Sequence, residues 1–239
     1  NKSSALLKQT IPLIGHTMIG CSNNLGGGII EWYKQAFYSN TAGGYAEIES
    51  DAQSSPPGAN GLVFLPFLLG ERAPFTDKDI RGTFFGINRE SQQQDFTKAV
   101  FESAAYVSND LLGLIRDEDF EIKALSVSGG LARIDLINQI KSDVTNLPVK
   151  VIDNFESTSL GALILLRVSL GHYDTIYSAA ADLVSIRKTI FPNKNNVEVY
   201  SEAFGLYREM AKLTGIIGSS HKKFTQKIQN SSSTTVSNL

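Results

Sequence analysis

The stretch LSVSGGLARIDLINQIKSDVTNLPVKV, residues 125–151, changes from the pattern of a strand to that of a helix and back. Alternating apolar residues before Ser128 predict a strand, and the apolar spacing after Gly130 predicts a helix. A second strand is predicted over residues 147–153. Strands that alternate with helices are typical of an α/β layer. The stretch therefore predicts an α/β fold with a mixed sheet flanked by helices.

The turn between this strand and helix contains two adjacent glycines, Gly129 and Gly130. Glycine has no Cβ, so its backbone can lie close to a ligand, and a helix start presents unpaired N–H groups. In open α/β sheets, ligands bind at the carboxyl ends of the strands. The turn matches neither a Walker A loop nor a GxGxxG fingerprint. Two interpretations therefore stand at this point, a nucleotide-binding turn and a tight turn without a ligand.

Helices and strands are also predicted on both sides of this stretch. Apolar residues recur with a helical period over residues 95–115, and a buried strand is predicted near residues 62–66. Residues 159–171 are apolar nearly all round, so we expect that helix to pack on two sides. We predict one domain over residues 1–218 and a disordered polar tail over residues 219–239.

The overall composition argues against several kinds of partner. The net charge of −2 gives no basic field that would attract nucleic acid or anionic lipid. No apolar run reaches the roughly 18 residues that span a bilayer. The single cysteine and three histidines lie far apart, so no structural zinc site is predicted. We expect a cytoplasmic protein that binds neither nucleic acid nor a membrane.

Five segments, taken in order, resemble the C-terminal domain of the FGGY family of carbohydrate kinases. The family signature appears as GTFFGINRESQQQDFTKAVFE, residues 82–102, at the allowed spacing. The other four segments are GGGIIEW (26–32), FLPFLLGERAP (64–74), SGGLARIDLINQIKSDVTNLPV (128–149) and ESTSLGALILLRVSLGHY (156–173). Five motifs in order are far more specific than any one of them, and the resemblance covers about residues 10–215.

The resemblance implies the ribonuclease H-like fold of actin/hexokinase-type ATPases. It implies transfer of the γ-phosphoryl group of Mg·ATP to a sugar or sugar acid such as D-xylulose or D-gluconate. Position by position, it places Gly129 and Gly130 against the nucleotide, with Gly27 and Glu31 approaching it from a second helix. Glu31 is alternatively a solvent-facing helix residue, and Trp32 is predicted to pack in the core. The expected ligands are ATP or ADP, Mg²⁺ and a sugar.

Two positions depart from the family pattern. Leu131 stands where relatives usually have glycine, and Ile134 stands where relatives often carry Ser or Asn that reaches the adenine or ribose. These changes remove backbone room and a polar contact, although Ile134 can still pack on a purine. They leave a second hypothesis open, a non-catalytic nucleotide-binding or interaction module that shares the fold.

The resemblance also implies a half that this sequence does not contain. In relatives an N-terminal half supplies the sugar pocket, an Asp general base and a Gly-Thr phosphate loop, and no segment here matches them. We therefore expect neither the catalytic base nor a metal ligand in this chain, and we predict that the chain alone is inactive. The N-terminal half is an expected partner, and a homodimer remains open because dimers are common in relatives.

A charged loop, GERAPFTDKDIRGTFFGI, occupies residues 70–87 and leads in the family toward the cleft between two domains. We expect Glu71, Arg72 and Arg81 to stabilise this loop through mutual salt bridges. The alternative is that Arg72 or Arg81 pairs with a carboxylate in the cleft.

Overall fold

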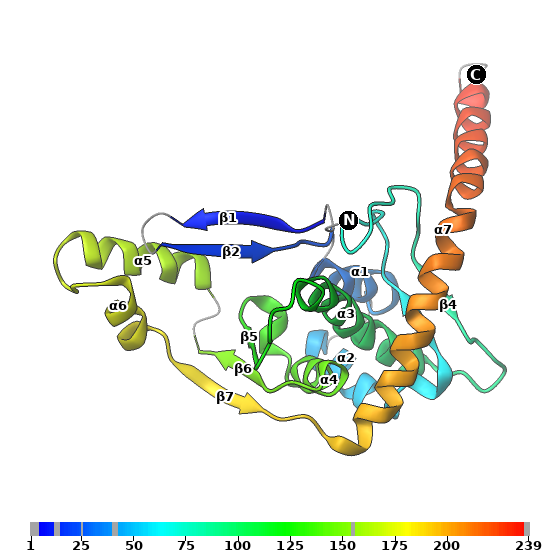
Figure 1. The fold of residues 1–239 in the computed structure, drawn as a ribbon. Helices are drawn as coiled ribbons and strands as arrows, with labels where there is room; N and C mark the ends of the chain where they lie inside the picture. The colour runs from blue at the N-terminus through cyan, green and yellow to red at the C-terminus, as the bar shows by residue number, and fades with distance from the viewer. Residues whose placement is uncertain (1–4, 12–14, 25, 40–42, 154–155, 237–239) are drawn as a thin grey trace.

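The structure, a computed structural model, describes residues 5–11, 15–24, 26–39, 43–153 and 156–236 of the 239-residue chain. It is mixed α/β, as predicted (Figure 1). The strands are β1 (Leu7–Ile11), β2 (His16–Gly20), β3 (Val63–Leu65), β4 (Thr83–Phe85), β5 (Leu125–Val127), β6 (Val149–Ile152) and β7 (Ile186–Ile190). The helices are α1 (Gly28–Phe37), α2 (Gly44–Ser54), α3 (Gln93–Arg116), α4 (Asp135–Thr145), α5 (Ser157–Ser169), α6 (Ile176–Leu183) and α7 (Lys194–Val236), with short 3-10 turns η1 (Ala59–Gly61) and η2 (Gly130–Arg133).

Helix α3 lies at the centre of the main hydrophobic core. It begins with a capping box, in which the Gln92 N–H donates to Asp95 Oδ2 at 2.9 Å. Ser55 Oγ donates to the other oxygen of the same carboxylate at 2.7 Å. The inner face of α3 packs against α1, α2, α4 and β3. The helix predicted over residues 95–115 is therefore confirmed.

Strand β6 is the middle strand of a three-stranded sheet. It pairs in parallel with β5 and antiparallel with β7. The side chains of Val149 and Val151 are fully buried. Helix α4 connects β5 to β6 and buries Ile137 and Ile140 in the main core. This strand–helix–strand unit is the one predicted from residues 125–151.

Two smaller sheets contain the remaining strands. β3 pairs with β4, and the rings of Phe64 and Phe84 stack with centroids 4.3 Å apart. β1 and β2 form an antiparallel pair that stands apart from the other strands (Figure 1). Side chains on both faces of this β1–β2 pair are exposed, including Leu7 at 68% and Met18 at 48%. The pair therefore has no packed face of its own.

Helices α5 and α6 form a second, smaller apolar cluster. Leu160 and Ile164 on α5 are buried against Ala179 on α6. The other side of α5 carries exposed leucines: Leu163 (39%), Leu166 (54%) and Leu170 (62%). The expectation that this helix packs on two sides is therefore wrong among the described residues, because only one of its apolar sides has a neighbour.

Helix α7 continues to Val236 and extends beyond the body of the molecule (Figure 1). Residues 219–236, for which the sequence predicts a disordered tail, are described as the end of α7. Gly218 lies against the backbone of Asp79, and Lys222 Nζ lies 3.0 Å from Asp79 Oδ1. Of the Lys, Ser, Thr and Asn residues on which the prediction of disorder rests, the lysines are also good helix formers. No helix in the described part of the chain is both long and apolar enough to span a bilayer.

Candidate functional site

The glycine turn after β5 has an open backbone face. Gly129 has φ +83° and ψ −172°, a conformation that residues with side chains rarely adopt. A Cβ added at Gly129 or Gly130 would meet no atom within 4 Å apart from those of its chain neighbours. Gly130 begins η2, and Asp135 begins α4 shortly after it. Open backbone thus lies at the carboxyl end of a strand, as the sequence predicts.

The start of α1 lies beside this turn. A Cβ added at Gly27, the residue before α1, would lie 3.5 Å from Leu131 Cγ. No side chain caps the N-terminus of α1, so its first N–H groups have no side-chain partner from the cap position. The structure therefore brings Gly27 to the side chain of Leu131, the residue that follows the two glycines and is far from Gly27 in the sequence.

Glu31 lies one turn into α1 and contacts the start of α2. Its carboxylate accepts hydrogen bonds from Tyr45 Oη and from Gln35 Nε2, the second at 2.9 Å. The Tyr45 bond, and then the Gln35 bond, lower the pKa of Glu31. Lys34 Nζ lies 4.5 Å from the centre of the Tyr45 ring. These contacts give Glu31 a role in joining α1 to α2, and its contact with a nucleotide stays a prediction.

The two positions that depart from the family pattern differ in their surroundings. Leu131 is partly buried against the main core and lies over Gly27. Ile134 is 8% exposed and belongs to the core itself. Leu131 therefore borders the open face of the turn, whereas Ile134 offers little surface to a ligand. Trp32, one residue after Glu31, stacks on Phe64 with ring centroids 5.7 Å apart, which confirms its predicted packing role.

Glu71 anchors the charged loop through backbone hydrogen bonds. Its Oε1 accepts from the N–H of Arg72 at 2.7 Å and from the N–H of Asn24 at 3.3 Å. Glu71 is 6% exposed, and this burial raises the pKa of its carboxyl against the opposing effect of the backbone donors. Further along the loop, Asp77 Oδ1 accepts from the N–H of Asp79 at 2.8 Å. Carboxylates thus satisfy loop N–H groups that have no helix or strand partner.

These bonds correct the expectation of mutual salt bridges. Arg81 Nη1 donates to the carbonyl oxygens of Lys78 and Ile80, both at 2.8 Å. Arg72 is exposed. The ion pairs found among the described residues do not include Glu71, Arg72 or Arg81. The Glu71 carboxylate accepts hydrogen bonds from backbone N–H groups and does not pair with a guanidinium. Hydrogen bonds between a carboxylate and the backbone, and not salt bridges, therefore hold this part of the loop.

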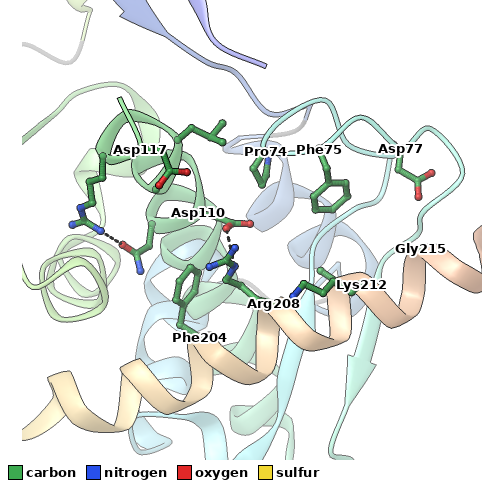
Figure 2. Close-up of a pocket in the computed structure, with 14 residues that line it drawn as sticks. Pro74, Phe75, Asp77, Asp110, Asp117, Phe204, Arg208, Lys212 and Gly215 are labelled. Carbon is green, nitrogen blue, oxygen red and sulfur yellow. Dashed lines mark hydrogen bonds and ion pairs between the residues drawn. The ribbon is translucent and has the colours of Figure 1, made fainter. Parts of the chain in front are cut away.

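A pocket of about 670 Å³ lies between α3, α7 and the charged loop (Figure 2). At its centre, Arg208 Nε lies 3.4 Å from Asp110 Oδ1. Asp110 is 9% exposed, and burial raises the pKa of its carboxyl while Arg208 opposes that rise. The other charged residues of the lining are Asp77, Arg116, Asp117 and Lys212.

Sequence reasoning missed this pocket. The signal it offered was a single aspartate within the apolar pattern of α3, because the charges that complete the pocket come from segments far away in the chain. The pocket shares no residue with the glycine turn. In the parts of the chain that the structure describes, no three His, Cys, Asp or Glu side chains gather as a metal-binding group.

Comparison with curated proteins gives one family. The family model described as "FGGY family of carbohydrate kinases, C-terminal domain" matches residues 11–170. The chain is 34% identical over 185 residues to a xylulose kinase of Staphylococcus epidermidis and 28% identical over 207 residues to a gluconokinase of Bacillus subtilis. These matches cover 77% and 83% of this chain but only 37% and 40% of the two relatives. The chain thus spans about two fifths of the length of the curated relatives it matches.

Solved structures show the same relationship. The ligand-bound xylulose kinase of Lactobacillus acidophilus matches with a TM-score of 0.82 and 27% identity, over 93% of this chain and 44% of that one. The gluconate kinase of Lactobacillus acidophilus matches with a TM-score of 0.77 and 28% identity, over 88% of this chain and 42% of that one.

Proposed function

The chain belongs to the FGGY family of carbohydrate kinases, and on this premise we propose that it forms the nucleotide-binding half of an ATP-dependent sugar kinase. The whole enzyme would transfer the γ-phosphoryl group of ATP to a hydroxyl of a sugar or sugar acid. The body of the chain would be a ribonuclease H-like domain of the actin/hexokinase type. The chain alone would be inactive, because the general base and the sugar pocket would come from the other half.

The open backbone at Gly129 and Gly130 is the observation that carries this proposal. Apart from their chain neighbours, nothing lies within 4 Å of the positions where their Cβ atoms would be. The uncapped start of α1 approaches the next residue, Leu131, at Gly27. Backbone N–H groups at a helix start favour negatively charged phosphates. The residues present therefore fit a nucleotide whose phosphates approach the glycine turn between β5 and η2.

The chain's own residues would bind and orient the nucleotide. Phosphoryl transfer depends mostly on positioning and on electrostatic stabilisation of the transferring group. Mg²⁺ would enter with the nucleotide, bound chiefly by phosphate oxygens and water, and would neutralise charge on the phosphates. The partly buried Leu131 would border the nucleotide from the core side.

Titration with ADP tests the binding half of the proposal. A ligand that binds only the folded state stabilises it by about 2.7 kcal/mol at a hundredfold excess over its dissociation constant. We expect Mg·ADP to raise the thermal midpoint of the chain by several degrees. The Gly130→Val variant should lose this rise, because its side chain would fill the open space without striking the protein.

Gly205→Val is the matched control. Gly205 also faces open space, but it lies on α7, away from the turn. The Gly205→Val variant should keep the full rise in thermal midpoint with Mg·ADP. Loss of the response in both variants, or in neither, would contradict nucleotide binding at the glycine turn.

The acceptor is proposed from the relatives. Those named xylulose kinase and gluconokinase support a sugar or a sugar acid. The chain joined to the N-terminal half of a relative should release ADP from Mg·ATP with D-xylulose or with D-gluconate, measured in separate reactions. Because the acceptor pocket would lie mostly in the added half, this experiment tests phosphoryl transfer by the chain and not its preference between acceptors.

The second candidate function is a non-catalytic nucleotide-binding or interaction module. The observation that favours it is the burial of Ile134, which offers little surface at a position where relatives often carry a polar contact. ADP binding by the isolated chain without turnover in the joined protein would support this alternative.

A further inference from the structure

We propose that the pocket between α3, α7 and the charged loop binds a small ligand that is rich in hydroxyl groups and carries no net charge, such as a sugar or an alditol (Figure 2). All the residues that line the pocket come from this chain, and none of them belongs to the glycine turn. The proposal therefore does not rest on the proposed function, and either can fail without the other.

The charges of the pocket lining balance one another. The lining contains three carboxylates and three cations, distributed over α3, α7 and the loop: Asp77, Asp110, Asp117, Arg116, Arg208 and Lys212. A charged ligand that enters such a pocket gives up its hydration without gaining a net counter-charge. A ligand with no net charge avoids this cost, so the charge balance favours a neutral occupant.

Hydrogen-bonding groups of both kinds remain available in the pocket. Arg208 Nε lies 3.4 Å from Asp110 Oδ1, and the Nη groups of Arg208 have no partner among the described residues. Within the same part of the chain, neither Lys212 nor Asp117 enters an ion pair. Cationic side chains only donate and carboxylates only accept, whereas a hydroxyl group does both. A ligand with several hydroxyl groups can therefore bond to both kinds of side chain.

Other polar groups of the lining are held in fixed positions. Asp77 Oδ1 accepts from the N–H of Asp79 at 2.8 Å. The second oxygen of Asp77 faces α7, because a Cβ added at Gly215 would lie 3.4 Å from Oδ2. Arg116 Nη1 donates to Asn109 Oδ1 at 3.2 Å, which leaves the amide nitrogen of Asn109 as a donor. Binding would cost little ordering of these groups, because their own hydrogen bonds already hold them.

Two aromatic rings supply the apolar part of the lining. Phe75 of the loop and Phe204 of α7 are partly buried against the main core, and both border the pocket. A sugar or an alditol carries C–H groups as well as hydroxyl groups, so it can pack on the rings while it bonds to the charged side chains. Small-molecule sites typically combine apolar walls with a few convergent polar groups, in volumes of about 300–1,000 Å³. The pocket volume of about 670 Å³ lies within that range.

A zwitterionic amino acid also carries no net charge, but it fits the arrangement less well. It holds its ammonium and carboxylate groups on one carbon atom. In Figure 2, Asp117 and Lys212 lie on opposite sides of the pair formed by Asp110 and Arg208. Hydroxyl groups spaced along a carbon chain match polar groups that are distributed in this way.

The test uses three ligands that share a six-carbon chain and differ only at one end. D-Glucitol ends in a hydroxymethyl group, D-gluconate in a carboxylate, and D-glucamine in an ammonium group. Each is titrated into the isotopically labelled chain, and the amide signals are followed by NMR. We expect D-glucitol to bind with a dissociation constant of about 1 mM or lower. Its saturable shifts should centre on residues 109–117 and 204–215. Both charged ligands should bind at least about fivefold more weakly.

Two substitutions test the charge balance directly. Lys212→Gln leaves the lining with one net negative charge, and Asp117→Asn leaves it with one net positive charge. Both residues are exposed, so we expect both variants to fold. Lys212→Gln should favour D-glucamine over D-gluconate by at least about threefold, and Asp117→Asn should reverse this preference. A merely structural role of these residues would not produce opposite changes.

Gly113→Leu tests the location of the site. Gly113 lines the pocket, and a Cβ there would meet no atom within 4 Å beyond its own helix and chain neighbours. Leucine also favours a helix over glycine, so this variant should fold and lose D-glucitol binding. Gly161→Leu is the matched control, because Gly161 has the same open surroundings on α5 and does not line the pocket. It should bind as the wild type does.

Several results would overturn the proposal. Shifts with D-glucitol that do not saturate, or that spread over the whole chain, would show a non-specific solvent effect. Tighter binding of D-gluconate or D-glucamine than of D-glucitol would replace the neutral ligand with a charged one. Tighter binding of L-alanine at the same amides would assign the pocket to an amino acid. Loss of binding in both leucine variants, or in neither, would remove the site from this pocket. None of these measurements uses nucleotide, so failure of ADP binding would leave their result unchanged.

Discussion

Glu102 places an ionisable group inside the main core. It is 1% exposed, and its Oε1 accepts a hydrogen bond from the N–H of Gly58 at 2.8 Å. Tyr106 Oη donates to its Oε2 at 3.3 Å. Burial raises the pKa of Glu102 from 4.5 to about 7, although the Gly58 N–H and the charge of Lys98 oppose that rise. The folded state therefore favours the protonated carboxyl.

This pKa shift predicts a pH dependence of stability. Because the folded pKa lies above the unfolded one, the stabilising contribution of Glu102 is full below about pH 4.5 and is lost as the pH rises toward 7. At about 1.4 kcal/mol per pKa unit, the loss is on the order of 3 kcal/mol. Glu102→Gln should remove this loss and gain stability relative to the wild type between pH 5 and pH 8.

Urea denaturation at the two pH values checks the prediction. Glu202→Gln, at an exposed glutamate of α7, is the control and should follow the wild type. An equal change in stability between pH 5 and pH 8 for Glu102→Gln and the wild type would show that the carboxyl does not titrate with folding.

A substitution at Glu71 tests whether this single residue anchors the charged loop. Glu71→Ala would leave the N–H groups of Arg72 and Asn24 without their acceptor in a partly buried site. Each unsatisfied buried group costs about 1–3 kcal/mol, so we expect a loss of about 2–3 kcal/mol in the free energy of unfolding. Glu121→Ala removes an exposed ion pair to Lys123 and should cost less than about 0.5 kcal/mol. Similar losses in the two variants would contradict the anchoring role.

At the scale of an element, α7 offers a matched pair of glycines. A Cβ at Gly218 would lie 2.9 Å from the carbonyl oxygen of Asp79, whereas a Cβ at Gly205 would meet nothing within 4 Å. Alanine favours a helix by about 1 kcal/mol over glycine, so Gly205→Ala should stabilise the chain by up to that amount. Gly218→Ala should destabilise it, because the methyl group pushes α7 away from the charged loop. Thermal or chemical denaturation of both variants measures these changes in stability. Stabilisation by both substitutions would show that α7 does not pack tightly against Asp79 at Gly218.

The elements that sequence predicted well are those whose side-chain pattern is specified within the element. Helix α3 and the β5–α4–β6 unit carry their apolar residues at the expected spacing, and local pattern sufficed. At two other elements, one sequence pattern is compatible with two structures. The apolar pattern of α5 indicates that two faces of the helix are suited to packing, but it does not show that both faces are packed. A polar lysine-rich segment suits an exposed helix as well as a disordered tail.

In the candidate site too, some features could be predicted from local sequence and others depend on tertiary contacts. The turn at Gly129 could be predicted from a strand, two glycines and a helix start. Its proximity to Gly27 was expected only from the family resemblance, because no local rule joins segments about a hundred residues apart. The pairing of Asp110 with Arg208 had no sequence signal, since it depends on how α7 crosses α3.

At the scale of the molecule, two apolar clusters of unequal size predict unequal stability. The main core contains α3 and most buried aromatic residues, whereas the α5–α6 cluster has three buried residues, Leu160, Ile164 and Ala179. Local opening costs least where few apolar contacts are lost. We expect amides of α5 and α6 to exchange hydrogen at least about tenfold faster than those of α3, a difference of about 1.4 kcal/mol or more.

Native-state hydrogen exchange with mass spectrometry measures this difference. The single tryptophan, Trp32, packs on the main core, so the midpoint of its fluorescence change should follow the α3 amides. Equal exchange in α5 and α3 would mean that the two clusters unfold as one cooperative unit.

The contact between Gly27 and Leu131 has an evolutionary consequence. The two positions share one small volume, since a methyl group on residue 27 would already touch the Leu131 side chain. A lineage in which position 131 is glycine is free to enlarge position 27, while a lineage with leucine at 131 must keep 27 small. Across the family, the sizes of these two residues should therefore vary in opposite directions, and exchanging one without the other should disturb the approach of α1 to the turn.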